Sequence, residues 1–362
     1  MEHNNILSSI FRCALFTSLI SMAVLLASCA KDTAQSDAVH HEHAMHKIWP
    51  DAQGRQLYGM AHKMSPDVMA ELREREIFPA YMTDEQIVRA MHGMHNYTWY
   101  VSDAELRGKQ GILILAHGFG DHGDLTLRES MQPVGDQQPT VFAFGMSMTM
   151  SSHIQLALDN LRAAGAQEIV VIPAASSRYS TLMRQWEYIF GLREKAEYAT
   201  VPRIVTQADI KFTRPMEDHP LVAEMLIDHA AEISQDPAHE EIIIVAHGPV
   251  DEGDNKTQLK TMDSLAKHLR AEGYAGVYPV TLQDDAPQEI RAENVRKMRT
   301  LVDEINNRGN VVLVITNLLG TRTVQNAIRR DLRGQEYRYN FKGLVQHEKF
   351  IEWVNTSVRE AP

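Results

Sequence analysis

Cysteine is nearly absent from this sequence, which has 2 cysteines, Cys13 and Cys29, in 362 residues. An exported chain with so few thiols has no disulfide framework and no thiolate metal site. Positive charge is also scarce, because 36 Lys and Arg residues stand against 47 Asp and Glu residues, a formal net charge of -11. This balance argues against a nucleic acid partner, since phosphate binding needs a basic face. The GxSxG pattern of serine hydrolases is absent too, so a hydrolase is the weakest interpretation.

Long apolar runs are missing except near the N-terminus. There, Arg12 precedes a mostly apolar stretch at 13–28, which is shorter than the roughly 20 residues of a membrane-spanning helix. The stretch ends in LLASC, which resembles a bacterial lipobox with Cys29 as the lipidated residue. We expect 1–28 to be a lipoprotein signal peptide, with a single transmembrane anchor as the alternative. We therefore expect an exported, periplasmic protein anchored through Cys29, and by resemblance to Gram-negative lipoproteins Ala30 favours sorting to the outer membrane.

Histidine is concentrated in two N-terminal segments. Residues 29–50 are expected to be a tether, and 51–108 a helical segment in which Ser65 and Thr83 are helix N-caps. The tether is either a solvated linker or a site for borderline divalent metals, carried by His40, His41, His43 and His46. In the helical segment, a helix that continues through Gly93 would place His92 and His95 one turn apart on one face. With Met91 and Met94 beside them, these histidines either bind a metal such as copper or simply pack.

The remainder of the chain alternates between short apolar runs and amphipathic stretches. The runs predict buried parallel strands at 112–115, 141–144, 169–172, 204–205, 277–280 and 311–315, and another that starts at Ile242. The amphipathic stretches predict helices at 154–164, 221–233, 259–271 and 295–305. Such alternation indicates an α/β fold of two tandem parallel-sheet halves, Rossmann-like in their winding, at 109–236 and 237–362.

Each half begins with the same pattern. The first half reads ILILAHGFGDHGD and the second reads IIIVAHGPVDEGD, so His117 and His247 each follow directly on the first strand of a half. Ligands in such sheets sit beyond the carboxyl ends of the strands, and glycines allow the backbone to approach them. Both histidines are therefore expected to face a ligand cleft. The alternative is a pair of turns with satisfied core histidines.

A family resemblance rests on these residues together with LDNLRAAGAQEIVVIPAA at 158–175 and DHPLVAEMLIDHAAEI at 218–233. Over about residues 110–355 the chain resembles the class II tetrapyrrole chelatases, specifically sirohydrochlorin cobaltochelatases of the CbiX type. The resemblance implies two α/β halves around a cleft in which a metal enters a tetrapyrrole. It implies His117 and His247 as catalytic residues and metal ligands. The implied metal is cobalt, nickel, iron or zinc, and no nucleotide is expected.

Other polar residues around these loops complete the candidate site. Asp251 and Glu252 are candidate metal ligands, although loop carboxylates are often only solvated. Arg178 and Arg322 take parallel places in the two halves and would hold substrate carboxylates, unless they are plain surface charges. Candidate substrate-binding carboxylates are Asp284 and Asp285, which follow the second strand of the second half.

Three features depart from the family pattern. The loops after the third strands, PAASSRYSTL and TNLLGTRTV, contain no His, although the family usually has one there. In the first half, the family's carboxylate after the second strand is replaced by Met146, Met148 and Met150. The exported location is also unusual for tetrapyrrole synthesis. A binding lipoprotein that carries metal or a metallated tetrapyrrole without turnover is therefore the alternative to the enzyme. Two tandem halves can form one cleft, so we expect a monomer.

Overall fold

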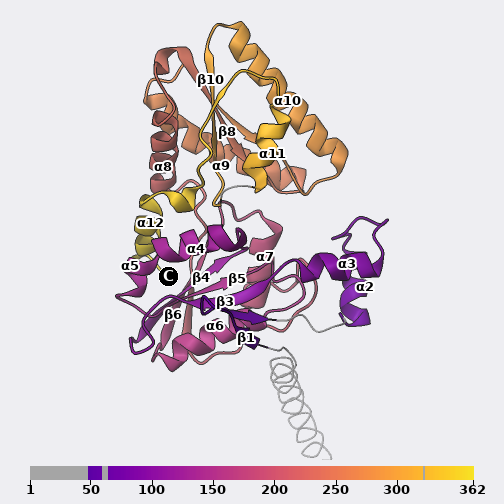
Figure 1. Ribbon diagram of the computed structural model, residues 1–362, viewed down its shortest axis with the longest axis vertical. Helices are drawn as coiled ribbons and strands as arrows, with labels where there is room; N and C mark the ends of the chain where they lie inside the picture. Colours follow the sequence, from indigo (N-terminus) through magenta and orange to yellow (C-terminus); the bar gives the residue numbers. More distant parts are fainter. Residues whose placement is uncertain (1–47, 59–63, 321–322) are drawn as a thin grey trace, which may run out of the picture. The chain divides into compact units, whose positions relative to one another are not determined.

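A computed structural model describes residues 48–58, 64–320 and 323–362, which all belong to one compact unit (Figure 1). The expected signal peptide with Cys29, most of the tether with its four histidines, and Arg322 lie outside the described residues. Within the described part, no helix has both the length and the hydrophobicity needed to cross a bilayer.

The first sheet has seven strands in the order β1-β2-β3-β5-β4-β6-β7. The strands are β1 (Ile48–Pro50), β2 (Gln56–Tyr58), β3 (Asn96–Tyr100), β4 (Gln110–Ala116), β5 (Thr140–Phe144), β6 (Glu168–Pro173) and β7 (Asp209–Phe212). Strands β4 to β7 are parallel, whereas β1, β2 and β3 add an antiparallel edge next to β5. The expected helical N-terminal extension thus also contributes strands to this sheet.

The second sheet is parallel, in the order β11-β10-β8-β9. Its strands are β8 (Glu240–Ala246), β9 (Gly276–Thr281), β10 (Val311–Thr316) and β11 (Arg338–Tyr339). The four parallel strands of each half follow the same order. The first of them (β4 or β8) lies between the second and the third, and the fourth (β7 or β11) is at the edge. This shared order confirms the predicted fold class of two similar parallel-sheet halves.

The helices begin largely where the sequence signals them. They are α2 (Pro66–Glu74), α3 (Asp84–His92), α4 (Gly120–Ser130), α5 (Gln132–Gly135), α6 (Ser152–Ala163), α7 (Thr181–Ile189), α8 (Pro220–Ala231), α9 (Glu252–Ala271), α10 (Gln288–Asn307), α11 (Thr323–Asp331) and α12 (Lys349–Arg359). Ser65 accepts a hydrogen bond from the Val68 amide, and Thr83 forms the expected capping box with Gln86. Helix α3 ends at His92 with Gly93 as its C-cap, so the expected placement of His95 on the same helical face is wrong.

One strand expectation is also wrong. Residues 204–205 form no strand, and the fourth strand of the first sheet is β7, at Asp209–Phe212. Val205 is 56% exposed, so its apolar character does not reflect burial in the sheet. Strand β7 lies at the sheet edge and alternates charged with apolar residues, which gives it a weak sequence signal.

The two halves share a core. Alternate residues of β4 face opposite sides, with Ile112 and Ile114 in a core that also includes Ile242 and Ile244 of β8. The last helix of each sequence half packs on the other half: α8 lies against α9 and β10, and α12 lies against α8 and β6. Trp353 of α12 is buried in this shared core. The halves are therefore joined by exchanged helices as well as by the chain between them.

A buried histidine lies between these exchanged helices. His229 on α8 is 1% exposed, and within the described residues neither of its ring nitrogens has a hydrogen-bond partner. Its ring centre is 5.5 Å from that of His347, whose Nε2 is 3.1 Å from a carboxylate oxygen of Asp228. Burial, reinforced by His347 and Lys342 against the opposing field of Glu232 and Asp228, lowers the pKa of His229 to about 4.

This pKa predicts a loss of stability on acidification. The unfolded chain takes up a proton on His229 near pH 6.5, whereas the folded chain does not. The contribution of His229 to the free energy of unfolding is therefore fully present above pH 6.5 and is lost as the pH falls toward 4. The expected loss is about 3 kcal/mol. His229→Leu should remove this part of the pH dependence without destabilising the protein at pH 7. Urea unfolding of both proteins at pH 7 and pH 4.5 measures the difference; equal acid sensitivity would contradict the assignment.

Candidate functional site

The two repeated loops have matching backbone geometry. Strand β4 ends at Ala116 and strand β8 at Ala246, and the glycine two residues later has a left-handed φ in both loops, +96° at Gly118 and +79° at Gly248. At Gly248, a Cβ atom would lie 2.7 Å from that of Thr281. Glycine is therefore required where the backbone turns to direct each preceding histidine away from its strand.

One cavity of about 760 Å³ receives both histidines. Its size falls within the usual range of small-molecule sites. The wall combines residues that follow strands of both halves, among them His117, Met146, Trp186, His247, Asp285 and Leu318. Because these side chains come from both sheets, the cavity lies beyond the carboxyl ends of two parallel sheets.

His247 has one ring nitrogen engaged and one directed at a carboxylate. Its Nδ1 is 3.0 Å from the Gly248 carbonyl oxygen, which can only accept, so Nδ1 carries the proton. The lone pair of the neutral ring is then on Nε2, which is 3.6 Å from Oδ2 of Asp285. Two ligands bound at about 2.1 Å to one tetrahedral ion are about 3.4 Å apart. His247 and Asp285 therefore have the tautomer and nearly the spacing of a pair that binds one divalent ion.

His117 faces the same cavity and lies against Phe119, with their ring centres 4.8 Å apart. The side chain remains accessible to solvent within the cavity, although protein surrounds it closely. This desolvation lowers the pKa of His117, and the nearby His247 lowers it further while Asp285 opposes the shift. His117 is consequently a neutral imidazole near pH 7, able to bind a metal or accept a proton.

Among the remaining candidate acids, most have partners away from the cavity. Asp251 caps α9, its carboxylate accepting from the Asp254 amide at 2.9 Å, and Glu252 is 3.8 Å from Lys256. Asp284 binds Arg291 at 2.8 Å. None of Asp251, Glu252 and Asp284 lines the cavity. Asp285 does.

The first loop has its own acids. Asp121 lines the cavity and pairs with Arg55 at 2.7 Å. Asp124 is buried, accepts hydrogen bonds from the Phe119 amide and the Tyr97 hydroxyl, and has its pKa raised by burial. Asp124 therefore holds the loop, and Asp121 contributes negative charge to the cavity wall.

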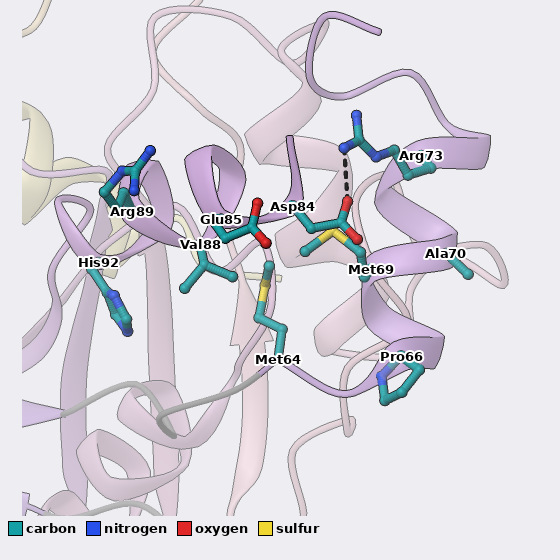
Figure 2. Close-up of a pocket in the computed structure, with 10 residues that line it drawn as sticks. All are labelled: Met64, Pro66, Met69, Ala70, Arg73, Asp84, Glu85, Val88, Arg89 and His92. Atoms are coloured by element: carbon teal, nitrogen blue, oxygen red, sulfur yellow. Dashed lines mark hydrogen bonds and ion pairs between the residues drawn. The ribbon is translucent and has the colours of Figure 1, made fainter. Parts of the chain in front are cut away.

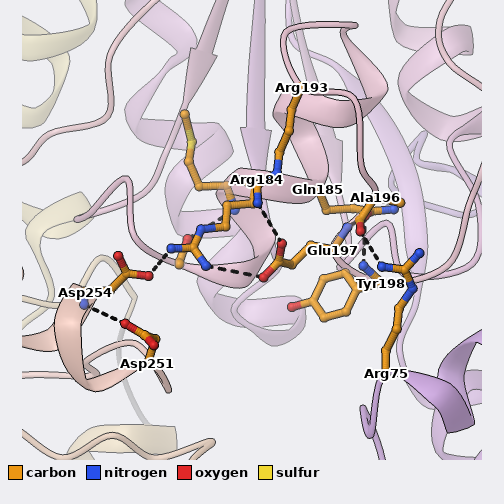
Figure 3. A network of polar contacts seen from close by, with 11 residues as sticks. Arg75, Arg184, Gln185, Arg193, Ala196, Glu197, Tyr198, Asp251 and Asp254 are labelled. Carbon is orange, nitrogen blue, oxygen red and sulfur yellow. Dashed lines mark hydrogen bonds and ion pairs between the residues drawn. The ribbon is translucent and has the colours of Figure 1, made fainter.

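An ion pair between the halves supports the cavity wall (Figure 3). Arg184 on α7 pairs with Asp254 in the first turn of α9 and lies 3.4 Å from Glu197. Gln185 accepts hydrogen bonds from the amides of Glu197 and Tyr198. Tyr198 lines the cavity, so this network fixes the wall from both halves.

Comparisons with known proteins bear on the fold. No protein-family model and no curated protein matches the sequence. Among solved structures, the chain is similar to the sirohydrochlorin ferrochelatase SirB from Bacillus subtilis, solved with Fe3+, at 17% identity and a TM-score of 0.51, over 70% of this chain and 95% of that chain. The chain has the class II chelatase fold. A second similar structure is DR2241 of Deinococcus radiodurans, a multi-domain protein described as structurally similar to chelatases, at 16% identity and a TM-score of 0.44, over 70% of this chain and 56% of that chain.

Of the two arginines expected to bind substrate, the structure describes Arg178. Arg178 does not line the cavity, and Glu217 holds it through two hydrogen bonds, of which that from Nε to Oε1 is 2.6 Å long. Arg322 is outside the described residues. The sequence resemblance implied a second histidine after the third strand of each half, and there the loops after β6 and β10 bring Ala174 and Leu318 to the cavity.

His92 lines a separate hollow of about 920 Å³ between α2 and α3 (Figure 2). Met64 and Met69 line it as well, and Arg73 pairs there with Asp84 at 2.7 Å. His95 is not among its lining residues. Over 48–58, 64–320 and 323–362, no group of three or more His, Cys, Asp or Glu residues is arranged to hold a metal ion.

Sequence reasoning missed the aromatic part of the main cavity. Trp186 lies on α7 and Tyr198 in the loop after it, and both line the cavity. The apolar spacing of α7 at 181–189 could have revealed the helix, but no pattern links it to the histidine loops. Among the other histidines, His122 lines the cavity, whereas His153 is buried beside Ser147 and His219 caps α8.

Proposed function

We propose that this protein binds a divalent metal ion and a tetrapyrrole in the cavity between its halves and inserts the metal into the macrocycle. The observation that carries the proposal is the position of the two equivalent histidines. His117 and His247 leave corresponding strands of the two halves and line one cavity, and Nε2 of His247 lies beside Asp285. Imidazole and carboxylate are ordinary ligands for cobalt, nickel, iron and zinc.

The reaction requires both metal transfer and proton acceptance. Two N–H bonds of the macrocycle break, two metal–nitrogen bonds form, and two protons leave. His247 and Asp285 are a ligand pair rather than a closed four-ligand set, which suits an ion that must be handed over. His117 is neutral near pH 7 and can accept one proton, and the carboxylate of Asp285 can accept the other as its metal bond breaks.

A second candidate is a protein that binds a metallated tetrapyrrole without turnover. It is favoured by the loops after β6 and β10, which place Ala174, Ala175, Leu318 and Leu319 at the cavity and supply no base from their described residues. In this alternative His117 or His247 would hold the metal of the bound macrocycle.

The test is metallation by the purified full-length protein. It is incubated with metal-free sirohydrochlorin or a metal-free porphyrin and Co2+, Ni2+ or Fe2+, while the absorption spectrum is followed. We expect the protein to form the metallated macrocycle catalytically, as seen in its absorption spectrum. This activity should be lost in a His117→Ala, His247→Ala double variant. Tight binding of the metallated macrocycle without turnover would support the second candidate, and no binding of either form would contradict both.

A further inference from the structure

The loop after α7 brings a buried phenol to the cavity. Tyr198 is 6% exposed and lines the cavity together with Thr181 and Asp285. Burial raises the pKa of its hydroxyl, and the charges of Asp285 and Glu197 raise it further, while a contact with the Thr181 hydroxyl opposes the shift. The hydroxyl is therefore protonated at pH 7. It can donate a hydrogen bond to a ligand in the cavity.

The first half holds the backbone around Tyr198. Besides the two amides that Gln185 accepts, its Nε2 donates to the Ala199 carbonyl at 3.1 Å. The Ala199 amide donates to the Met148 carbonyl at 3.1 Å. The loop is thus fastened to α7 and to the segment after β5.

Helix α2 holds the same loop. Arg75, its C-cap residue, donates from Nη1 to the Ala196 carbonyl at 2.6 Å, and Glu71 accepts from the Thr200 amide. Ala196 and Thr200 are two residues before and two residues after Tyr198, so α2 grips the chain on both sides of it. Each contact involves a charged side chain, which makes it stronger than a neutral hydrogen bond. The hydroxyl end of Tyr198 points away from Arg75 (Figure 3).

We propose that α2 positions Tyr198 as a hydrogen-bond donor to the macrocycle, so that a helix that precedes both halves takes part in the site. This rests on the proposed function, in which the macrocycle occupies the cavity. The acceptors that a tetrapyrrole offers are its carboxylates and its unprotonated ring nitrogens. Arg75 and Glu71 are positioning residues, because they act on the loop and leave contact with the ligand to Tyr198.

The first test measures binding of metal-free sirohydrochlorin to the full-length protein by quenching of tryptophan fluorescence, to which Trp186 contributes. Tyr198→Phe should weaken binding by about 5-fold to 10-fold, the effect of one hydrogen bond. A Glu71→Ala, Arg75→Ala double variant should weaken it by a similar factor. In the Tyr198→Phe background, the double change should cost little more, because the hydroxyl that α2 positions is already gone. An equal loss in both backgrounds would overturn the inference.

Conservative changes and a matched control separate positioning from general damage to α2. A Glu71→Gln, Arg75→Lys double variant keeps an acceptor and a donor at the loop, so it should retain most of the affinity. Arg73→Ala is the control, because Arg73 also lies on α2 but pairs with Asp84. A loss in Arg73→Ala equal to that in the Glu71→Ala, Arg75→Ala variant would contradict the inference.

A fluorine label tests the position of Tyr198 without a macrocycle. Protein grown with fluorotyrosine gives a fluorine NMR resonance for Tyr198, which is assigned by its absence in Tyr198→Phe. In the Glu71→Ala, Arg75→Ala variant this resonance should move toward that of free fluorotyrosine, whereas an unchanged resonance would overturn the inference. If sirohydrochlorin does not bind to the unaltered protein, the proposed function and the donor role fail together, and the resonance still decides whether α2 positions the phenol.

Discussion

Replacing His247 with alanine is expected to weaken Co2+ binding by about 100-fold or more, as measured by equilibrium dialysis of the metal with the purified protein. Loss of an outer-shell group that only orients a ligand costs 10–100-fold, and loss of the ligand itself should cost at least as much. Nε2 of His247 is the open nitrogen, since Nδ1 is bound to the Gly248 carbonyl.

Asp285→Asn should have a comparable effect, and the double variant with His247→Ala should cost little more than either change alone. The losses of affinity caused by removing two ligands of one ion do not add, because the first change already destroys the site. The same comparison with His117→Ala tests whether the two histidines share that ion across the halves. If they do, His117→Ala also removes most of the affinity; if they serve separate sites, the losses add.

Two matched changes are controls. His268 is an exposed histidine on α9, and Asp284 is engaged by Arg291, so His268→Ala and Asp284→Asn should leave Co2+ affinity nearly unchanged. A loss in these controls equal to that in His247→Ala would show that the ion is not held where Nε2 of His247 meets Asp285.

Trp353→Ala is expected to lower the free energy of unfolding by about 3–5 kcal/mol, the usual cost of removing a fully buried aromatic side chain. Trp353 is 1% exposed and belongs to the core that both sheets share, although it lies on the last helix of the chain. The effect should therefore appear in one cooperative transition, because neither half keeps its core without the exchanged helices.

Urea unfolding followed by far-UV circular dichroism measures this effect. Ile290→Ala is the control, since Ile290 is 40% exposed and its truncation should change stability by less than about 0.5 kcal/mol. Two separate transitions, of which only one shifts in Trp353→Ala, would contradict the shared core.

The strands that could be predicted are those buried on both faces. Strands β4, β8 and β10 are continuous apolar runs, and the runs gave their positions within a few residues. Strand β3 was not predicted because its sequence, NYTWY, includes the polar residues Asn96 and Thr98, which are buried. Helix α4 was not predicted because it begins inside the repeated loop, whose glycines are typical of a turn. Helix exchange between the halves depends on long-range packing, which periodicity cannot report.

The candidate site was predictable where the sequence repeats itself. Matching loops after the first strands give His117 and His247 equivalent places, and a parallel sheet directs both beyond its carboxyl ends. The choice between Asp284 and Asp285 was not predictable, since it follows from the backbone turn at Gln283, where φ is +49°. Asp285 then lines the cavity and Asp284 binds Arg291. Trp186 lies on α7, whose counterpart in the second half is α11, but no repeated sequence marks α7 or the segment of Tyr198.

The most direct test of the cavity as a metal site is anomalous diffraction at the cobalt edge, from crystals of the full-length protein equilibrated with Co2+. We expect one anomalous peak in the cavity, about 2.1 Å from Nε2 of His247 and from a carboxylate oxygen of Asp285. A cobalt peak elsewhere, with none between these two side chains, would contradict it.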